Sequence, residues 1–268
     1  MNKKRSILLP PKIPPAVVSV WAALIAAAHL LPTVAIFGTG GNFSLAAALF
    51  PLSGILFGPL AGVLCAAAGG FLGSVVAPHT AWMGPATFII GTTTAFTAGC
   101  IAWSGWPPIT INSKGSFIIN GGIIVYLIGT LLWFSQEIGR SFIWLPVFCY
   151  GLGFIALITG SLFSGKVLTG DKKLLKLPVL WLCAFGGMFG GATVGNFFAI
   201  VLYHIPRENW IILVPQAILE RTLFSIGTML IGAPLLIGLA KIGIFLGPQP
   251  EEDISPPPDP PPAITPFE

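Results

Sequence analysis

Long apolar runs recur along the chain from Ala16 to Phe245, and short polar stretches separate them. A helix needs about 20 residues to cross the hydrocarbon core of a bilayer, which is ~30 Å thick. The pattern therefore predicts an all-α fold, a polytopic bundle of transmembrane helices. The eight expected segments are Ala16–Phe37, Ser44–Phe57, Leu60–Ala77, Gly84–Trp103, Phe117–Phe134, Phe142–Phe163, Pro178–Tyr203 and Pro215–Lys241.

The stretch from Ser44 to Ala77 contains no charge, and as a single helix it would be about 50 Å long, too long for one crossing. Proline removes a backbone donor and clashes with the preceding turn. We therefore expect Gly58-Pro59 to end one helix and begin the next as a tight hairpin.

The basic residues test this hairpin, because positive charge collects on the cytoplasmic side. With the hairpin, only Arg140 and Arg207 fall on the opposite side, and Arg221 lies within the membrane. We therefore predict a prokaryotic plasma-membrane protein with both termini in the cytoplasm. The residues expected on the cytoplasmic side are Lys3, Lys4, Arg5, Lys12, Lys114, Lys166, Lys172, Lys173, Lys176 and Lys241.

Three regions follow from this pattern: an N-terminal cytoplasmic segment over 1–15, a transmembrane domain over 16–245 and a proline-rich, acidic tail over 246–268. The first apolar run exceeds the roughly 7–15 residues of a signal-peptide core, so we expect it to remain as a helix. The tail has the composition of a disordered or polyproline-like segment.

Composition agrees with a membrane protein, since 54% of the 268 residues are hydrophobic and 8% are charged. In soluble domains about a quarter of the residues are charged. The net charge of +4 comes from the loop clusters, so no nucleic-acid partner is expected. The four cysteines show no metal-ligand spacing, and no catalytic or phosphate-binding motif occurs, so we predict no metal, no cofactor and no enzyme activity. These cysteines are Cys65, Cys100, Cys149 and Cys183.

Small residues recur every fourth position in two stripes, which in lipid let helix backbones approach closely. The first helix carries a smooth face of Ala22, Ala23, Ala26 and Ala27. Internal packing and docking to another membrane subunit are both open for this alanine face. The stripes are Gly54, Gly58, Gly62, Ala66 and Gly70, and Gly187, Gly191, Gly195 and Ala199.

The loops opposite the lysines carry polar side chains suited to a substrate site. Trp82 and Trp210 fit an aromatic belt at the headgroup level, and they are weaker candidates for stacking a flat ligand. The candidate loop residues for substrate binding are Asn42, His79, Trp82, Glu137 and Arg140.

Glu220 and Arg221 are the most informative polar residues, because a charge at bilayer depth costs about 2.5–3.5 kcal/mol. Adjacent helix residues do not face each other, so we expect each to find a partner on another helix. If the helix begins at Pro215, Glu220 lies ~8 Å from its outer end. With Asn196 and Gln216 they predict an outward-opening polar pocket, and a structural salt-bridge network is the alternative.

The run from Ala46 to Gly62, AAALFPLSGILFGPLAG, resembles the signature hairpin of the substrate-binding (S) subunits of energy-coupling factor transporters. Pro215 to Glu220 and Gly232 to Leu235 are similar to that family's last helix, and the alanine face resembles its docking motif. The resemblance implies an importer subunit that binds a vitamin or similar small nutrient. It also implies a transmembrane coupling subunit and ABC-type ATPases as partners.

The family has six core helices, so the segments Phe117–Phe134 and Phe142–Phe163 look like an inserted pair. Two other functions stay open. A membrane sensor or scaffold domain could use a similar hairpin. An intramembrane lipid-modifying enzyme could use Glu220 and a histidine as acid and base.

Overall fold

A computed structural model describes residues 13–35, 42–81, 83–103, 109–110, 118–170, 173–241 and 246–248. The α-helices are α1 (Pro15–Ala28), α2 (Ala46–Val76), α3 (Phe88–Ala102), α4 (Gly121–Ser135), α5 (Glu137–Ser141), α6 (Gly151–Leu168), α7 (Lys173–Tyr203) and α8 (Arg207–Ala240). Nearly all of the predicted N-terminal segment and tail lies outside the described residues.

Short elements connect these helices. Strands β1 (Pro32–Ala35) and β2 (Asn42–Ser44) pair antiparallel, as do β3 (Ile109–Thr110) and β4 (Ile118–Ile119). The turns η1 (Pro78–Thr80) and η2 (Gly84–Thr87) precede α3, and a π-helical turn, η3 (Pro146–Tyr150), leads into α6.

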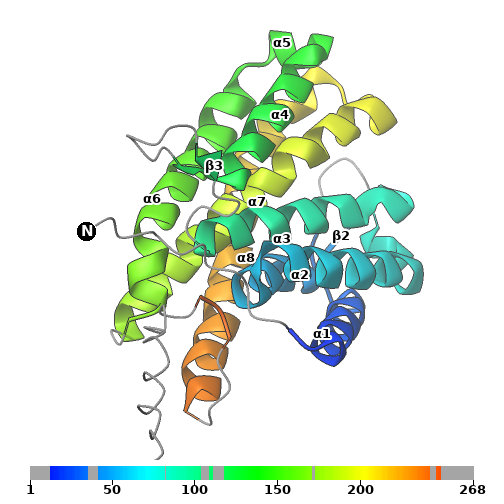
Figure 1. The fold of residues 1–268 in the computed structure, drawn as a ribbon. Helices are drawn as coiled ribbons and strands as arrows, with labels where there is room; N and C mark the ends of the chain where they lie inside the picture. The colour runs from blue at the N-terminus through cyan, green and yellow to red at the C-terminus, as the bar shows by residue number, and fades with distance from the viewer. Residues whose placement is uncertain are drawn as a thin grey trace, which may run out of the picture.

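The predicted all-α transmembrane class is confirmed. Four helices are long and apolar enough to cross a membrane: Ala46–Val76, Pro146–Leu168, Lys173–Tyr203 and Arg207–Ala240. Helices α1, α3 and α4 are shorter and also apolar. Helix α7 contacts α3, α4, α6 and α8, and it lies between the α2–α3 layer and the α4–α6 pair in Figure 1. Helices suit lipid because they satisfy their own backbone groups.

The hairpin at Gly58-Pro59 is confirmed by the backbone of α2. Gly58 has φ +82°, which breaks the helix at a position that glycine adopts without strain. The two halves then fold back on each other, since a side chain at Gly62 would strike the backbone of Gly54. The Ser53 hydroxyl also donates to the Gly62 carbonyl across the hairpin, at 3.2 Å.

Several predicted segment boundaries are wrong. Helix α7 begins at Lys173 instead of Pro178, α6 ends at Leu168 instead of Phe163, and two boundaries differ by more. The first helix ends at Ala28 instead of Phe37, because the chain turns at Pro32 into strand β1. The last helix begins at Arg207 instead of Pro215, so Pro215 lies inside α8. Prolines are tolerated inside membrane helices because neighbouring groups satisfy the freed carbonyl.

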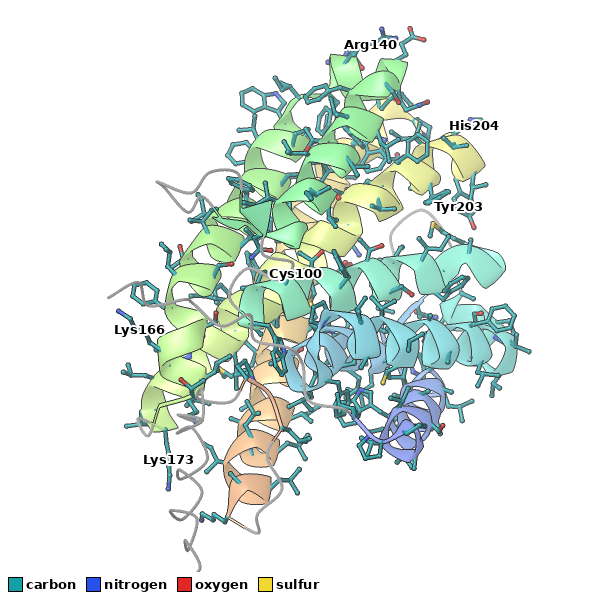
Figure 2. All side chains as sticks on the ribbon, in the orientation of Figure 1. Cys100, Arg140, Lys166, Lys173, Tyr203 and His204 are labelled. Carbon is teal, nitrogen blue, oxygen red and sulfur yellow. The ribbon has the colours of Figure 1, made fainter. Side chains whose placement is uncertain are left out.

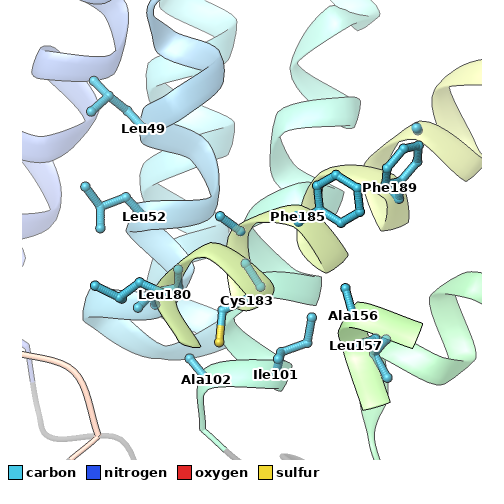
Figure 3. Close-up of a cluster of buried hydrophobic side chains, with 14 of the residues drawn as sticks. Leu49, Leu52, Ile101, Ala102, Ala156, Leu157, Leu180, Cys183, Phe185 and Phe189 are labelled. Atoms are coloured by element: carbon cyan, nitrogen blue, oxygen red, sulfur yellow. The ribbon is translucent and has the colours of Figure 1, made fainter. Parts of the chain in front are cut away.

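Glycine allows the helices to approach to backbone distance, as the stripes predicted. A Cβ on Gly54 would overlap the Ala95 carbonyl of α3, and one on Gly187 would lie 2.6 Å from the Ala98 Cβ. Buried apolar side chains of α2, α3, α6 and α7 fill the space around these contacts (Figure 3). Leu52, Ile101 and Leu157, for example, are completely buried.

The charged residues at the helix ends lie at the two ends of the molecule, as the predicted order of membrane crossings requires. Figure 2 shows Arg140 and His204 at one end of the molecule and Lys166 and Lys173 at the other. The positions of Lys114 and Lys172 lie outside the described residues. The side that faces the cytoplasm therefore stays a prediction from the charge pattern.

Candidate functional site

A partly open cavity of about 80 Å³ lies where α2, α3, α7 and α8 meet the β1–β2 hairpin. Aromatic side chains form much of its wall, with Phe43 from β2, Phe50 from α2 and Phe224 from α8. Helices α4, α5 and α6 contribute no described residue to the lining. The polar and charged residues that line the cavity are His29, Ser44, Thr80, Thr87, Thr94, Glu220 and Arg221.

Glu220 and Arg221 are the predicted site residues that line this cavity. The expectation that they cannot meet is wrong, since Arg221 Nη1 lies 3.4 Å from Glu220 Oε2. The long arginine side chain bends back along α8 and also donates to the Ala217 carbonyl at 3.3 Å. Its guanidinium carbon lies 5.4 Å from the centre of the Phe189 ring on α7, a favourable cation–π distance.

The pair leaves polar atoms unused. Glu220 is 4% exposed, and its Oε1 has no hydrogen-bond partner among the described residues. Arg221 Nε is likewise buried, and no residue that the structure describes accepts a hydrogen bond from it. Because α8 starts at Arg207, Glu220 lies about 20 Å along the helix, not ~8 Å. Buried groups without partners are costly and uncommon, so these atoms set the pair apart from an ordinary ion pair.

His29 faces the same cavity from the end of α1. Its Nδ1 lies 3.0 Å from Thr80 Oγ1 and 3.3 Å from Ser44 Oγ. The Thr80 hydroxyl already donates to the Ala77 carbonyl at 2.8 Å, so Thr80 accepts from His29 Nδ1–H. In the neutral ring this pattern leaves Nε2 as an acceptor. Nε2 is buried and has no hydrogen-bond partner in the part of the chain that the structure describes.

Gln216 and Asn42 lie beside the cavity without lining it. The Gln216 amide donates from Nε2 to the Ala35 carbonyl at 2.9 Å, which ties α8 to strand β1. Asn42 pairs with Ala35 in the β1–β2 register. The two residues therefore hold the strand pair against α8, next to the aromatic wall that Phe43 provides.

The remaining predicted residues are not brought to the cavity. Asn196 donates to the Tyr150 hydroxyl at 3.2 Å, on the side of α7 that faces η3. His79 is exposed in η1, and Glu137 and Arg140 are exposed in α5, where Figure 2 shows Arg140 at one end of the molecule. Trp82 lies outside the described residues.

Trp210 was expected in an aromatic belt at the headgroup level, but its side chain faces the protein interior and not the outside. It is 2% exposed and packs edge-on against Trp133 of α4, with ring centres 4.9 Å apart. Its indole nitrogen donates to the Ile205 carbonyl at 3.3 Å. Trp210 therefore joins α8 to α4 inside the protein.

The alanine face of α1 divides into two parts. Ala22 is buried, and its carbonyl lies 2.5 Å from the position that a Cβ on Gly69 of α2 would occupy. Ala26 is half-buried, and Ala23 and Ala27 are exposed. Internal packing thus explains Ala22, and Ala23 and Ala27 remain available to an outside partner.

Sequence reasoning missed His29, Ser44, Thr80, Thr87 and Thr94 as lining residues. His29 has no polar neighbour in sequence that indicates a site, because its partner Thr80 lies 51 positions away along the chain. One usable signal was present: a histidine within an apolar run needs a buried partner.

Comparison with known proteins gives two matches. A family model described as the S component of an ECF-type riboflavin transporter matches residues 15–141, which confirms the resemblance seen in the hairpin. An uncharacterised protein of the archaeon Methanocaldococcus jannaschii is 23% identical over 181 residues, covering 66% of this chain and 55% of that protein. The chain thus matches only about half the length of that relative. No solved structure matches the chain significantly.

Proposed function

Because residues 15–141 are similar to the S components of energy-coupling factor transporters, we propose that the chain is the membrane-embedded substrate-binding subunit of an ATP-driven importer. Its substrate is a vitamin or a similar small nutrient. The protein lies in a prokaryotic plasma membrane with both termini in the cytoplasm. The family match is the observation that carries this proposal.

The cavity supports substrate binding within the membrane domain. The matched part of the chain supplies the walls from His29 to Thr94, and α7 and α8 complete them with Met188, Glu220 and Arg221. Charged groups at bilayer depth are expensive and are usually kept for function.

An importer subunit of this class needs a surface for its coupling subunit, and Ala23 and Ala27 provide one on α1. Small side chains let a second helix approach closely. Both alanines are exposed on the described surface, beside Val20, which is 71% exposed. We place the coupling subunit against this face, with the ABC-type ATPases bound to that subunit.

Affinity purification of the tagged full-length chain from its native membranes tests the proposal. We expect a transmembrane coupling subunit and ATPases to co-purify. Ala23→Trp combined with Ala27→Trp should reduce their recovery at least tenfold, because two bulky rings would block helix approach. Leu131→Trp is the control, since Leu131 is a similarly exposed position on α4.

The outcomes separate the two parts of the proposal. If no ATPase is recovered with the unaltered chain, the proposed function is wrong. If ATPases are recovered equally with the double variant, the importer assignment stands and the docking surface lies elsewhere. Ala22→Trp is unsuitable as a test, because Ala22 packs against α2 and its replacement would disturb the fold.

A further inference from the structure

An open apolar groove lies between the start of α7 and the end of α8, on the outside of the bundle. It is lined by Leu177 of α7 and by Leu230, Ala233, Pro234, Ile237 and Gly238 of α8. Leu230 is 61% exposed, and no described atom outside its own helix backbone lies within 4 Å of a Cβ built on Gly238. None of these residues lines the cavity of the candidate site. The groove is therefore a separate surface feature.

Lysines mark the end of this groove at the membrane surface. No Asp, Glu, Lys or Arg occurs between Lys176, near the start of α7, and Arg207, at the start of α8. None occurs between Arg221 and Lys241 either. Residues 222–240 span about 28 Å of helix, close to the thickness of the hydrocarbon core. Lys176 and Lys241 therefore lie at headgroup level, and the groove lies just below them in the hydrocarbon.

Helix periodicity places lysines above the groove on both helices. Lys173 precedes Leu177 by four positions, and Lys241 follows Ile237 by four, so each shares a helix face with a groove residue. Lys176 lies one turn from Lys173 and is half-buried. Figure 2 shows Lys173 at the end of the molecule where α8 ends in Figure 1. The three lysines therefore stand together at the headgroup end of the groove.

Among the described residues, no acidic side chain neutralises these lysines. Glu137 and Glu208 belong to α5 and to the first turn of α8, at the opposite end of the molecule. Glu220 lies about 30 Å from Lys241 along α8. None of the described lysines forms an ion pair. The N-terminus of α7 adds its partial positive charge, so this end of the groove favours an anionic occupant.

From these observations we infer that the groove between α7 and α8 binds an anionic phospholipid, with an acyl chain along the groove and the phosphate beside Lys173, Lys176 and Lys241. Basic pockets between membrane helices bind anionic lipid headgroups. A soluble anion would not cover the apolar groove, and a lipid without net charge would not neutralise the lysines. The inference does not rest on the importer function, and in the proposed orientation the lipid belongs to the cytoplasmic leaflet.

Native mass spectrometry of the purified full-length protein in neutral detergent tests this inference by measuring the affinity for the first added lipid. The probe is phosphatidylglycerol, and phosphatidylcholine with the same acyl chains is the lipid without net charge. Each lysine near an anionic lipid contributes roughly a fivefold gain in affinity. We therefore expect phosphatidylglycerol to bind at least tenfold more tightly. Equal affinities for the two lipids would overturn the inference.

Glycerol phosphate separates the lipid from a free phosphate group, because it carries the charge without the acyl chains. We expect it to give no binding at the concentration at which phosphatidylglycerol saturates the protein. Glycerol phosphate that bound as tightly as the lipid would show that the groove contributes nothing, and this result would also overturn the inference.

Two double variants locate the headgroup. Lys173→Gln combined with Lys241→Gln should lower the affinity for phosphatidylglycerol about 25-fold and leave that for phosphatidylcholine unchanged. Arg140→Gln combined with Arg207→Gln is the matched control, because it removes the same charge at the opposite end of the molecule. Equal losses in the two double variants would show that the lipid responds to net charge alone, and the proposed site would be wrong.

Gly238→Leu locates the acyl chain. The new side chain would extend into the groove without meeting another described helix, so we expect the affinity for phosphatidylglycerol to fall at least fivefold. Ala68→Leu is the control, because it adds a leucine at an exposed position of α2, and it should leave the affinity unchanged. The same affinity in both variants would place the chain elsewhere and overturn the inference.

Two other occupants of the groove would give different results. A second copy of the chain would appear as a dimer in the same spectra, and Gly238→Leu would dissociate it. The acidic tail would compete with the lipid, so the combined changes Glu251→Gln, Glu252→Gln and Asp253→Asn would create a preference for phosphatidylglycerol that the unaltered chain lacks. Either result would overturn the inference. We expect a monomer whose preference for phosphatidylglycerol is already present in the unaltered chain.

Discussion

The α2 hairpin and the α4–α6 pair both contain glycines at close contacts, yet what these glycines face differs. In the pair they face side chains, as Gly153 faces the Tyr126 hydroxyl. In the hairpin, glycine brings backbone against backbone, as at Gly54 and the Ala95 carbonyl. Around the α4–α6 pair large aromatic rings fill the remaining space, and Trp133 of α4 is completely buried between Tyr150 of η3 and Trp210 of α8. The hairpin lines the cavity and the pair does not.

The two regions should therefore respond differently to mutation: the α2 hairpin forms a rigid part of the cavity wall, and the α4–α6 pair supports the fold away from the cavity. Backbone atoms in direct contact have no rotamers with which to adjust, so the hairpin should tolerate no added atoms. Large aromatic side chains fill volume, so the α4–α6 pair should suffer most when atoms are removed. Ligand binding should depend directly on the first region and only through stability on the second.

The largest expected effect is that of Trp133→Ala. It removes a completely buried indole, its edge contacts and the hydrogen bond from Nε1 to the Gly139 carbonyl at 3.1 Å. We expect the free energy of unfolding to fall by about 3 kcal/mol, the low end for such truncations, because lipid removes part of the transfer term. Titration with SDS from detergent micelles, followed by circular dichroism, measures it.

Trp144→Ala is the control in the same region. Trp144 is 57% exposed and stacks on Phe148 with ring centres 5.8 Å apart. We expect a loss of at most about 0.5 kcal/mol. An equal loss in both variants would contradict the view that Trp133 fills the interior. Ligand affinity of the folded Trp133→Ala protein should be unchanged.

A second prediction concerns added volume in the hairpin. In Gly54→Ala the new methyl group would overlap the Ala95 carbonyl, so α2 and α3 must separate. We expect the free energy of unfolding to fall by about 2 kcal/mol, with weaker ligand binding because both helices line the cavity. The same SDS titration measures stability.

Gly238→Ala is the matched control on α8, where nothing lies within 4 Å of the added Cβ. Alanine favours helix more than glycine, so this variant should be neutral or more stable by up to about 1 kcal/mol. If Gly54→Ala proved as harmless as Gly238→Ala, the close packing of α2 on α3 would be wrong.

Much of this fold could be predicted from the sequence, because the signals were local. Apolar runs of membrane length indicated the helices, and Gly58-Pro59 indicated the hairpin. The ends of α1 and α8 could not be predicted in the same way. A proline is compatible with a helix start and with a membrane-helix interior, so Pro215 did not determine where α8 begins.

The candidate site was less predictable, because packing brings its residues together. Glu220 and Arg221 were found because charge within an apolar run is unusual at any position. Ser44 and Thr94 carry small hydroxyl groups that are common in membrane helices, and nothing local separates a cavity hydroxyl from one bonded to its own helix. Asn196 has the polarity of a site residue, but in the folded protein its amide donates a hydrogen bond to Tyr150 away from the cavity.

The smallest predicted effect tests the bond that joins α8 to the hairpin. The Thr228 hydroxyl donates to the Ala48 carbonyl of α2 at 2.7 Å, next to the cavity residues Ala47 and Phe224. Interhelical hydrogen bonds in membrane proteins contribute on average about 0.6 kcal/mol. Thr228→Val should therefore lower the free energy of unfolding by about that amount, measured in the same SDS titration.

Thr222→Val is the control, because the Thr222 hydroxyl donates only within α8, to the Ile218 carbonyl at 2.8 Å. It keeps the same change of side chain and removes no contact between helices. A difference between the two variants isolates the bond to α2. If both variants lost the same free energy of unfolding, packing alone would hold α8 to the hairpin, and the Thr228 hydrogen bond would not stabilise the cavity wall.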